Sequence, residues 1–174
     1  MQYSTIILAL TAAASAIDIR LHNGAGNKNC AGSYLACVGI NPGVCCTPAS
    51  STRYSRAAYA AIPTNWNLIL TGWYNGGCST VGVTASVSNS NYRCVADPNP
   101  TTNLAFSGAT YAFAGKRRRG EGERCEEVQP NLFVLEDSTE YDLVDMPEPL
   151  VETLVCIPLL PFQSLKTWIC LLTL

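Results

Sequence analysis

Cysteine is the residue type in this chain whose chemistry is easiest to anticipate. The 174 residues include nine cysteines and one histidine. In an oxidising compartment such a set predicts a disulfide framework. A zinc site would need C-x-x-C pairs or a Cys/His cluster, and the sequence has neither, so we expect no metal and no cofactor. The eight disulfide candidates are Cys30, Cys37, Cys45, Cys46, Cys78, Cys94, Cys125 and Cys156.

Three aromatic residues could bind a ligand. Trp66, Trp73 and Tyr74 lie close together in the sequence, with asparagines beside them. Exposed aromatic rings can stack on a sugar while amides supply hydrogen bonds. Large aromatic side chains also fill protein cores, so core packing is the alternative for all three.

Catalytic residues are not expected. Catalysis would need a nucleophile beside a base, or two carboxylates facing one cleft. The only histidine is His22, and residues 17–115 contain just two carboxylates, those of Asp18 and Asp97. We therefore expect that the protein is not an enzyme.

A basic run of four residues, Lys116, Arg117, Arg118 and Arg119, joins two segments of opposite charge. Residues 17–115 carry five cations and two acids, whereas residues 120–156 carry eleven acids and one cation. Nucleic-acid binding needs a basic face, and the acidic neighbour argues against it. Two interpretations of the run remain open, a dibasic processing site and an intact solvated loop.

The N-terminal residues 1–16 have the pattern of a secretory signal peptide. An apolar run from Ile6 to Ala14 leads into the small-residue cleavage signature Ala14-Ser15-Ala16. We therefore expect a secreted, extracellular protein. We also expect it to be a monomer. The remaining chain divides into a cysteine-rich β body at 17–115, a basic and glycine-rich linker at 116–124, an acidic hairpin with a short helix at 125–156, and an apolar tail at 157–174.

The apolar tail differs from the rest of the chain. It is short and interrupted by Pro158, Pro161 and Lys166, so we expect no membrane span. It also contains Cys170, which makes the cysteine count odd. The tail is either an extension that comes from the gene model or an apolar segment that is buried or binds a partner.

The segments that contain the candidate residues are predicted to be mainly β-strands. Residues 65–94 contain three extended runs rich in β-branched and aromatic residues, and residues 103–115 predict two more around Ser107-Gly108. Residues 131–144 predict a hairpin. By contrast, the C-x6-C-x7-C-C spacing and turn residues of 30–46 predict a loop-rich cap.

A short helix is predicted near the end of the acidic segment. Asp145 is followed three residues later by Glu148, which is typical of a helix N-terminus, and the helix would run through Val155. The predicted fold class is therefore mainly β, a small disulfide-rich antiparallel β-sandwich or sheet, with a short C-terminal helix.

The chain resembles an uncharacterised family of small secreted cysteine-rich proteins from filamentous fungi. The resemblance rests on the signal peptide and on the blocks CAGSYLAC, INPGVCC, AIPTNWNLILTGWYNGGC and VLEDSTEYDLVDM, and it extends to about Val155. GWYNGGC is also similar to segments of crystallin-type β-sandwiches. The family resemblance implies an extracellular location, disulfides and candidate effectors of plant-associated fungi; it implies no catalytic residue.

The expected function is extracellular binding by an effector-like protein, connected with virulence. The expected partner is a host protein or a cell-wall glycan. Two alternatives remain open: an antimicrobial or killer-type toxin or inhibitor, and a cell-wall glycan-binding module.

Overall fold

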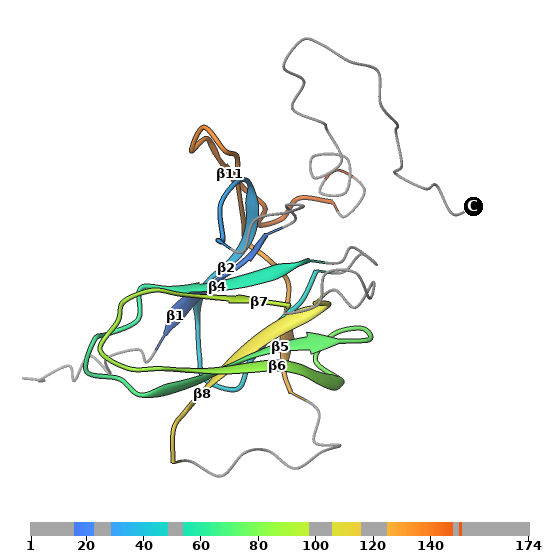
Figure 1. Ribbon diagram of the computed structural model, residues 1–174. Helices are drawn as coiled ribbons and strands as arrows, with labels where there is room; N and C mark the ends of the chain where they lie inside the picture. Colours follow the sequence, from blue (N-terminus) through green and yellow to red (C-terminus); the bar gives the residue numbers. More distant parts are fainter. Residues whose placement is uncertain are drawn as a thin grey trace, which may run out of the picture.

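A computed structural model shows how the chain is arranged (Figure 1) and describes residues 16–22, 29–48, 54–97, 106–115, 125–147 and 150. Most of the expected signal peptide, the basic run, Cys156 and the apolar tail lie outside the described residues. The interpretations of these segments stay predictions. Within the described part of the chain, no helix is long and apolar enough to cross a membrane.

The described residues form two sheets, and the first, called sheet A, has six strands in the order β11-β10-β2-β1-β4-β7. All its neighbouring pairs are antiparallel. The central strand β1 alternates apolar and polar residues, with its apolar side chains buried. The strands are β1 (Ile17–His22), β2 (Tyr34–Ile40), β4 (Arg56–Ala60), β7 (Arg93–Ala96), β10 (Leu132–Val134) and β11 (Glu140–Asp142).

The second sheet, called sheet B, has five strands in the order β6-β5-β8-β3-β9. Its pairs are antiparallel except for β3 and β9, which run parallel. The strands are β3 (Cys45–Cys46), β5 (Leu68–Tyr74), β6 (Thr80–Val87), β8 (Gly108–Phe113) and β9 (Glu127–Val128). The expectation of a mainly β, disulfide-rich protein is therefore confirmed.

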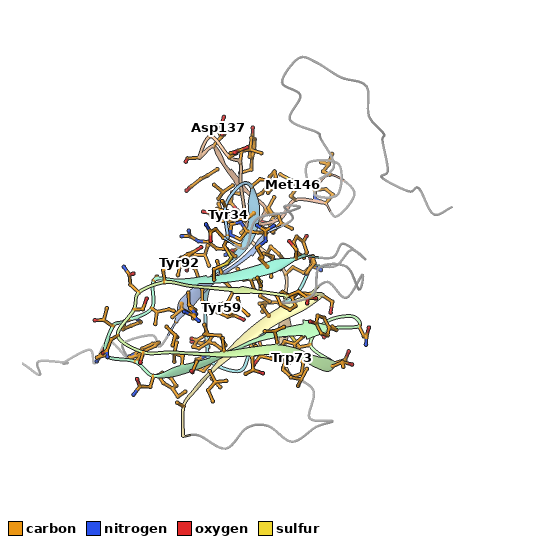
Figure 2. All side chains as sticks on the ribbon, viewed as in Figure 1. Tyr34, Tyr59, Trp73, Tyr92, Asp137 and Met146 are labelled. Carbon is orange, nitrogen blue, oxygen red and sulfur yellow. A yellow bond between two sulfur atoms is a disulfide. The ribbon has the colours of Figure 1, made fainter. Side chains whose placement is uncertain are left out.

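Buried side chains of the two sheets form one hydrophobic core. Successive side chains of a strand point to opposite faces, so each sheet turns every second residue toward the other sheet. Sheet A contributes Ile19, Leu21 and Tyr59, and sheet B contributes Leu70 and Tyr111, all of them buried (Figure 2 labels Tyr59).

Two buried tyrosines connect the sheets in opposite directions. The hydroxyl of Tyr59 on β4 donates to the carbonyl of Thr71 on β5 at 3.0 Å. The hydroxyl of Tyr111 on β8 donates to the carbonyl of Ile40 on β2 at 2.8 Å. Burial raises the pKa of both phenols, because the phenolate would lose its solvation. Both groups therefore stay protonated and act as donors.

Within the described part of the chain, three disulfides bind six of the eight candidate cysteines: Cys30–Cys94, Cys37–Cys46 and Cys45–Cys78. The adjacent residues Cys45 and Cys46 take different partners because neighbouring side chains of a strand point to opposite faces. Cys46 bonds across the core to β2 of sheet A, and Cys45 bonds to the turn that follows β5.

The acidic segment takes part in both sheets. Its strand β9 pairs with β3 of sheet B, and β10 lies between β11 and β2 of sheet A. The predicted hairpin is confirmed as β10 and β11. A cut in the basic run would therefore leave the two pieces of the chain hydrogen-bonded to each other in both sheets.

Residues 30–46 differ from the predicted loop-rich cap. The segment contains β2, which pairs with β1 on one side and with β10 on the other. The turn residues Gly32 and Gly43 adopt positive φ, but they lie outside this strand. The prediction gave too much weight to these turn residues and too little to the apolar run YLACVGI between them.

Two other predictions fall largely outside the described residues and are not supported by the residues that are described. Residues 106–115 contain one strand, β8, and Phe106 makes only an isolated bridge to Tyr54. The predicted C-terminal helix is not among the described elements. Asp145 has φ 63°, outside the extended conformation that an N-cap residue needs, and the chain turns there. Most of the remaining residues of that helix lie outside the described part of the chain.

Candidate binding face

The three candidate aromatic residues do not form one platform. Trp73 and Tyr74 are consecutive on β5 and therefore point to opposite faces of sheet B. Tyr74 packs on the core side, and Trp66 also packs against the core. Only Trp73 lies on the outer face of the sheet (Figure 2).

Tyr74 and Trp66 have well-defined partners at the core. The ring of Tyr74 stacks on Phe106 with centroids 5.6 Å apart, and its hydroxyl donates to Asp97 Oδ2 at 3.2 Å. Burial and the Asp97 carboxylate raise the pKa of Tyr74 to about 12. Trp66 meets Phe113 edge to face, with centroids 4.9 Å apart. Packing therefore accounts for both residues.

The outer face of sheet B has a regular layout around Trp73. Thr71 of β5 is paired with Thr84 on one side and with Thr110 on the other, so three threonines lie side by side across three strands. The residues on this side of the sheet, here called the Trp73 face, are Ile69, Thr71, Trp73, Val81, Thr84, Ser86, Thr110 and Ala112, of which Thr110 is only 8% exposed. None of these side chains carries a charge.

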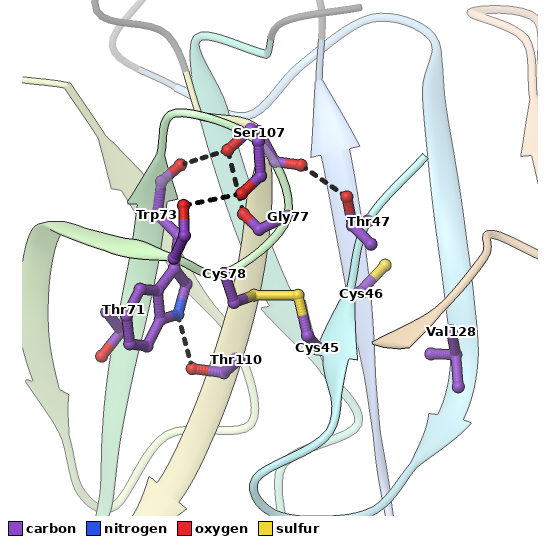
Figure 3. Close-up of a disulfide and its surroundings, with 12 residues drawn as sticks. Cys45, Cys46, Thr47, Thr71, Trp73, Gly77, Cys78, Ser107, Thr110 and Val128 are labelled. Atoms are coloured by element: carbon purple, nitrogen blue, oxygen red, sulfur yellow. Dashed lines mark hydrogen bonds between the residues drawn. A yellow bond between two sulfur atoms is a disulfide. The ribbon is translucent and has the colours of Figure 1, made fainter. Parts of the chain in front are cut away.

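The indole of Trp73 is fixed in place on this face. Its Nε1 donates to Thr110 Oγ1 at 2.8 Å, which ties the side chain of β5 to the neighbouring strand β8 (Figure 3). The direct cross-strand partner of Trp73 is Gly108, which has no side chain to compete for the space. A ring held by a hydrogen bond needs little further ordering when a ligand stacks on it.

The turn after β5 supports the backbone beside Trp73. Ser107 donates its amide to the Trp73 carbonyl at 2.8 Å and its hydroxyl to the Gly77 carbonyl at 2.9 Å. The Cys45–Cys78 disulfide joins the same turn to β3 (Figure 3). A Cβ added at Gly108 would lie 2.8 Å from the Gly77 carbonyl oxygen, so the turn packs directly on this glycine.

A third sulfur lies next to this disulfide. The Sγ atoms of Cys45, Cys78 and Cys125 are all within 4.8 Å of one another. Metal binding by cysteine requires thiolates, and two of these sulfurs are bonded to each other. In the oxidised protein this cluster is therefore not a set of metal ligands.

The Trp73 face suits an uncharged, hydroxyl-bearing ligand. An indole offers an apolar surface for C–H groups, and threonine and serine hydroxyls both donate and accept hydrogen bonds. A charged ligand would find no ion-pair partner among the side chains that define this face. The chemistry of the face is therefore stacking and neutral hydrogen bonding.

Sequence reasoning identified Trp73 but missed the threonines. Thr71, Thr84 and Thr110 are far apart in the sequence, and only strand register brings them together. The available signal was the alternation of polar and apolar residues in LILTGWY and TVGVTASV. It identifies the outward residues of one strand but not their neighbours on the next.

The outer face of sheet A carries charge instead. Asp18, Arg20 and His22 of β1 point outward, and Arg56 of β4 is the cross-strand partner of His22. The guanidinium carbon of Arg20 lies 5.0 Å from the centroid of the Tyr34 ring. This face carries charges of both signs, because β11 adds Glu140 and Asp142 in the rows of His22 and Arg20, and part of it is covered.

Comparison with known proteins gives one match. No curated protein and no solved structure matches the chain. A family model described as an N-terminal domain, ARB_05566_N, matches residues 18–131. These residues include β2 to β9 and all of β1 except Ile17, and they make up well over half of the chain. The chain therefore belongs to the ARB_05566_N family.

Proposed function

We propose that this protein is secreted and acts outside the cell by binding, as an effector-like factor, rather than by catalysis. Three disulfides in a small β domain are compatible with an extracellular protein. The binding surface is the Trp73 face. The observation that carries this proposal is the fixed indole of Trp73 within a row of uncharged hydroxyl side chains.

A matched pair of substitutions tests this surface. Thr84→Arg puts a cation in the middle of the Trp73 face. Thr80→Arg puts the same side chain on the same strand, but opposite Tyr74, which points away from that face. Both threonines are exposed, so both variants should fold.

The readout is host colonisation by strains that carry one or the other allele, together with intact mass of the secreted protein. We expect secretion of both variants and impaired colonisation with Thr84→Arg only. Equal colonisation by the two strains would reject the Trp73 face as the binding surface. Retention of the protein inside the cells would reject secretion.

A cell-wall glycan-binding module is the second candidate function. It is favoured by the stacking surface of Trp73 beside neutral hydroxyls, which matches the alternating C–H and hydroxyl groups of a neutral sugar. Insoluble chitin or β-glucan should deplete the protein from solution, and Trp73→Ala should abolish that depletion. If neither polysaccharide retains the wild-type protein, this candidate fails while the host-protein alternative stands.

A further inference from the structure

His22 is a buried histidine at the end of β1. It lies on the outer face of sheet A and is only 2% exposed. Neither Nδ1 nor Nε2 has a hydrogen-bond partner among the residues that the structure describes. A buried polar group without a partner is costly and rare in native proteins, so its presence calls for an explanation.

Two arginines and a tyrosine surround the imidazole. Arg56 of β4 and Tyr34 of β2 are the direct cross-strand partners of His22, and the two rings have centroids 5.0 Å apart. Arg20 lies two residues earlier on the same face of β1. Arg56 is itself 4% exposed. The charges that act on the imidazole are those of Arg56 and Arg20, and both are positive.

Residues 29–33, here called the cover, close this site from outside. Cys30 is bonded to Cys94 on β7, and Arg56 donates from Nη1 to the Asn29 carbonyl at 2.8 Å. Tyr92 adds a longer hydrogen bond from its hydroxyl to the Cys30 carbonyl at 3.4 Å. Tyr92 itself lies near Arg20 and Tyr34. The backbone of the cover faces the imidazole while much of its outer side is exposed.

Protonation of His22 is disfavoured in this arrangement. Burial lowers the pKa of His22 from 6.5 to about 4, and Arg56 and Arg20 act in the same direction. The backbones of Ala31 and Gly32 oppose this lowering without compensating for it. Because the folded protein holds the neutral form, its stability is complete above pH 6.5 and decreases as the pH falls toward 4.

We propose that the cover is an acid-sensitive flap, and that protonation of His22 opens it and exposes the side chains of His22 and Arg56 on the outer face of sheet A. A protonated imidazole needs water or an acceptor. The cover is the element that can provide access to water, since β1 is paired with both β2 and β4 from Ile19 to His22. The Cys30–Cys94 bond limits the opening and keeps the rest of the sheet intact.

The wild-type protein allows a direct test because His22 is the only histidine in the chain. A pH titration by NMR follows its imidazole resonance and the backbone amides of the cover in the same sample. We expect a His22 midpoint well below 6.5, with the amides of Ala31 and Gly32 shifting at the same midpoint. Amides of the core residues Tyr59 and Tyr111 should not change there.

Three results would overturn the proposal. A His22 midpoint near 6.5 would mean that the imidazole is already solvated at neutral pH. Amides of the cover that do not follow His22 would mean that nothing opens. Core amides that change at the same midpoint would mean unfolding of the whole domain instead of a local flap.

A variant provides the matched control. His22→Gln keeps a neutral polar side chain that cannot be protonated, so the amides of the cover should no longer titrate in this range. In the wild type, the equilibrium constant for opening should rise by up to about tenfold per pH unit between pH 6.5 and 4. The same rise in His22→Gln would assign the titration to another group and contradict the proposal.

Discussion

The outer faces of the two sheets are built from strands with the same alternation of side chains, but they carry different residue types. On sheet A the outward residues of β1 and β4 include Arg20, His22 and Arg56, and residues 29–33 cover part of them. On sheet B the outward residues of β5, β6 and β8 are uncharged, and the disulfide-bonded turn after β5 packs on this face at Gly108, beside Trp73. The alternation of a strand determines which residues point outward. The connections between strands determine whether those residues stay exposed.

The difference between the faces follows from the connections on each side. The cover belongs to the connection between β1 and β2, and a disulfide ties it down across sheet A to β7. The β5–β6 connection is a short turn that the Cys45–Cys78 disulfide holds against β3. The long connection lies over the outward side chains of β1 and β4, whereas the short turn covers only the position of Gly108 on its face. One disulfide therefore closes a site, and the other supports an open one.

The largest loss of stability is expected when the hydrophobic core between the two sheets is disrupted. Phe106 is fully buried, stacks on Tyr74 and lies against Gly72. Phe106→Ala should reduce the free energy of unfolding by about 3–5 kcal/mol, because it leaves a cavity in the shared core. Denaturant unfolding measures this loss. Val81→Ala is the control, since Val81 is 52% exposed and should change stability little. A small loss for Phe106→Ala would show that the faces do not share one core.

Removing the anchor of the cover should affect sheet A alone. Cys30→Ser with Cys94→Ser should cost about 2–4 kcal/mol in unfolding free energy. It should also move the pKa of His22 up toward 6.5, because opening then costs less. The titration of His22 and the denaturant midpoint measure the two effects.

The other cross-links provide the control for this anchor. Cys37→Ser with Cys46→Ser removes the bridge between the sheets and should also lower stability, but it leaves the cover tied to β7. The pKa of His22 should then remain low. If both double variants raise the pKa of His22 equally, general destabilisation and not the cover controls this histidine.

Much of the fold could be predicted from local patterns. The extended runs of 65–94 became β5, β6 and β7, and the hairpin of the acidic segment became β10 and β11. These predictions succeeded because alternation and turn residues act over a few neighbouring positions. The short strand β4 has the sequence RAAYA, in which polar and apolar residues do not alternate, and all five residues are buried. It was missed for that reason.

The candidate site could be predicted only in part, because it depends on contacts between distant segments. Trp73 was identified by its residue type, but its separation from Tyr74 required knowledge of which face each occupies. The partner of Trp73 is Thr110, 37 residues later in the chain. The sequence around His22 likewise does not indicate that this side chain is buried. The cover over it is held by the Cys30–Cys94 disulfide, which joins residues 64 positions apart.

A change at Gly108 should affect sheet B and leave sheet A unchanged. The Cβ of Gly108→Ala would lie 2.8 Å from the Gly77 carbonyl oxygen and 3.0 Å from Cys78 Sγ. The turn must then move, at a cost of about 1–3 kcal/mol. Unfolding measurements report the cost, and faster reduction of Cys45–Cys78 reports the movement. The His22 pKa serves as the internal control and should not change; a shift there would mean that the two faces are coupled.

The smallest effect is expected at the hydrogen bond that fixes Trp73. Thr110→Val removes the acceptor of the indole N–H while keeping the shape of the side chain, and should cost about 1 kcal/mol. Thr84→Val is the matched control, because Thr84 lies on the same face in the next strand but one and is exposed to solvent. Exchange of the Trp73 indole proton, followed by NMR, should speed up in Thr110→Val only. Equal exchange in the two variants would mean that Thr110 does not hold the indole, and that the open face of sheet B is less ordered than the covered face of sheet A.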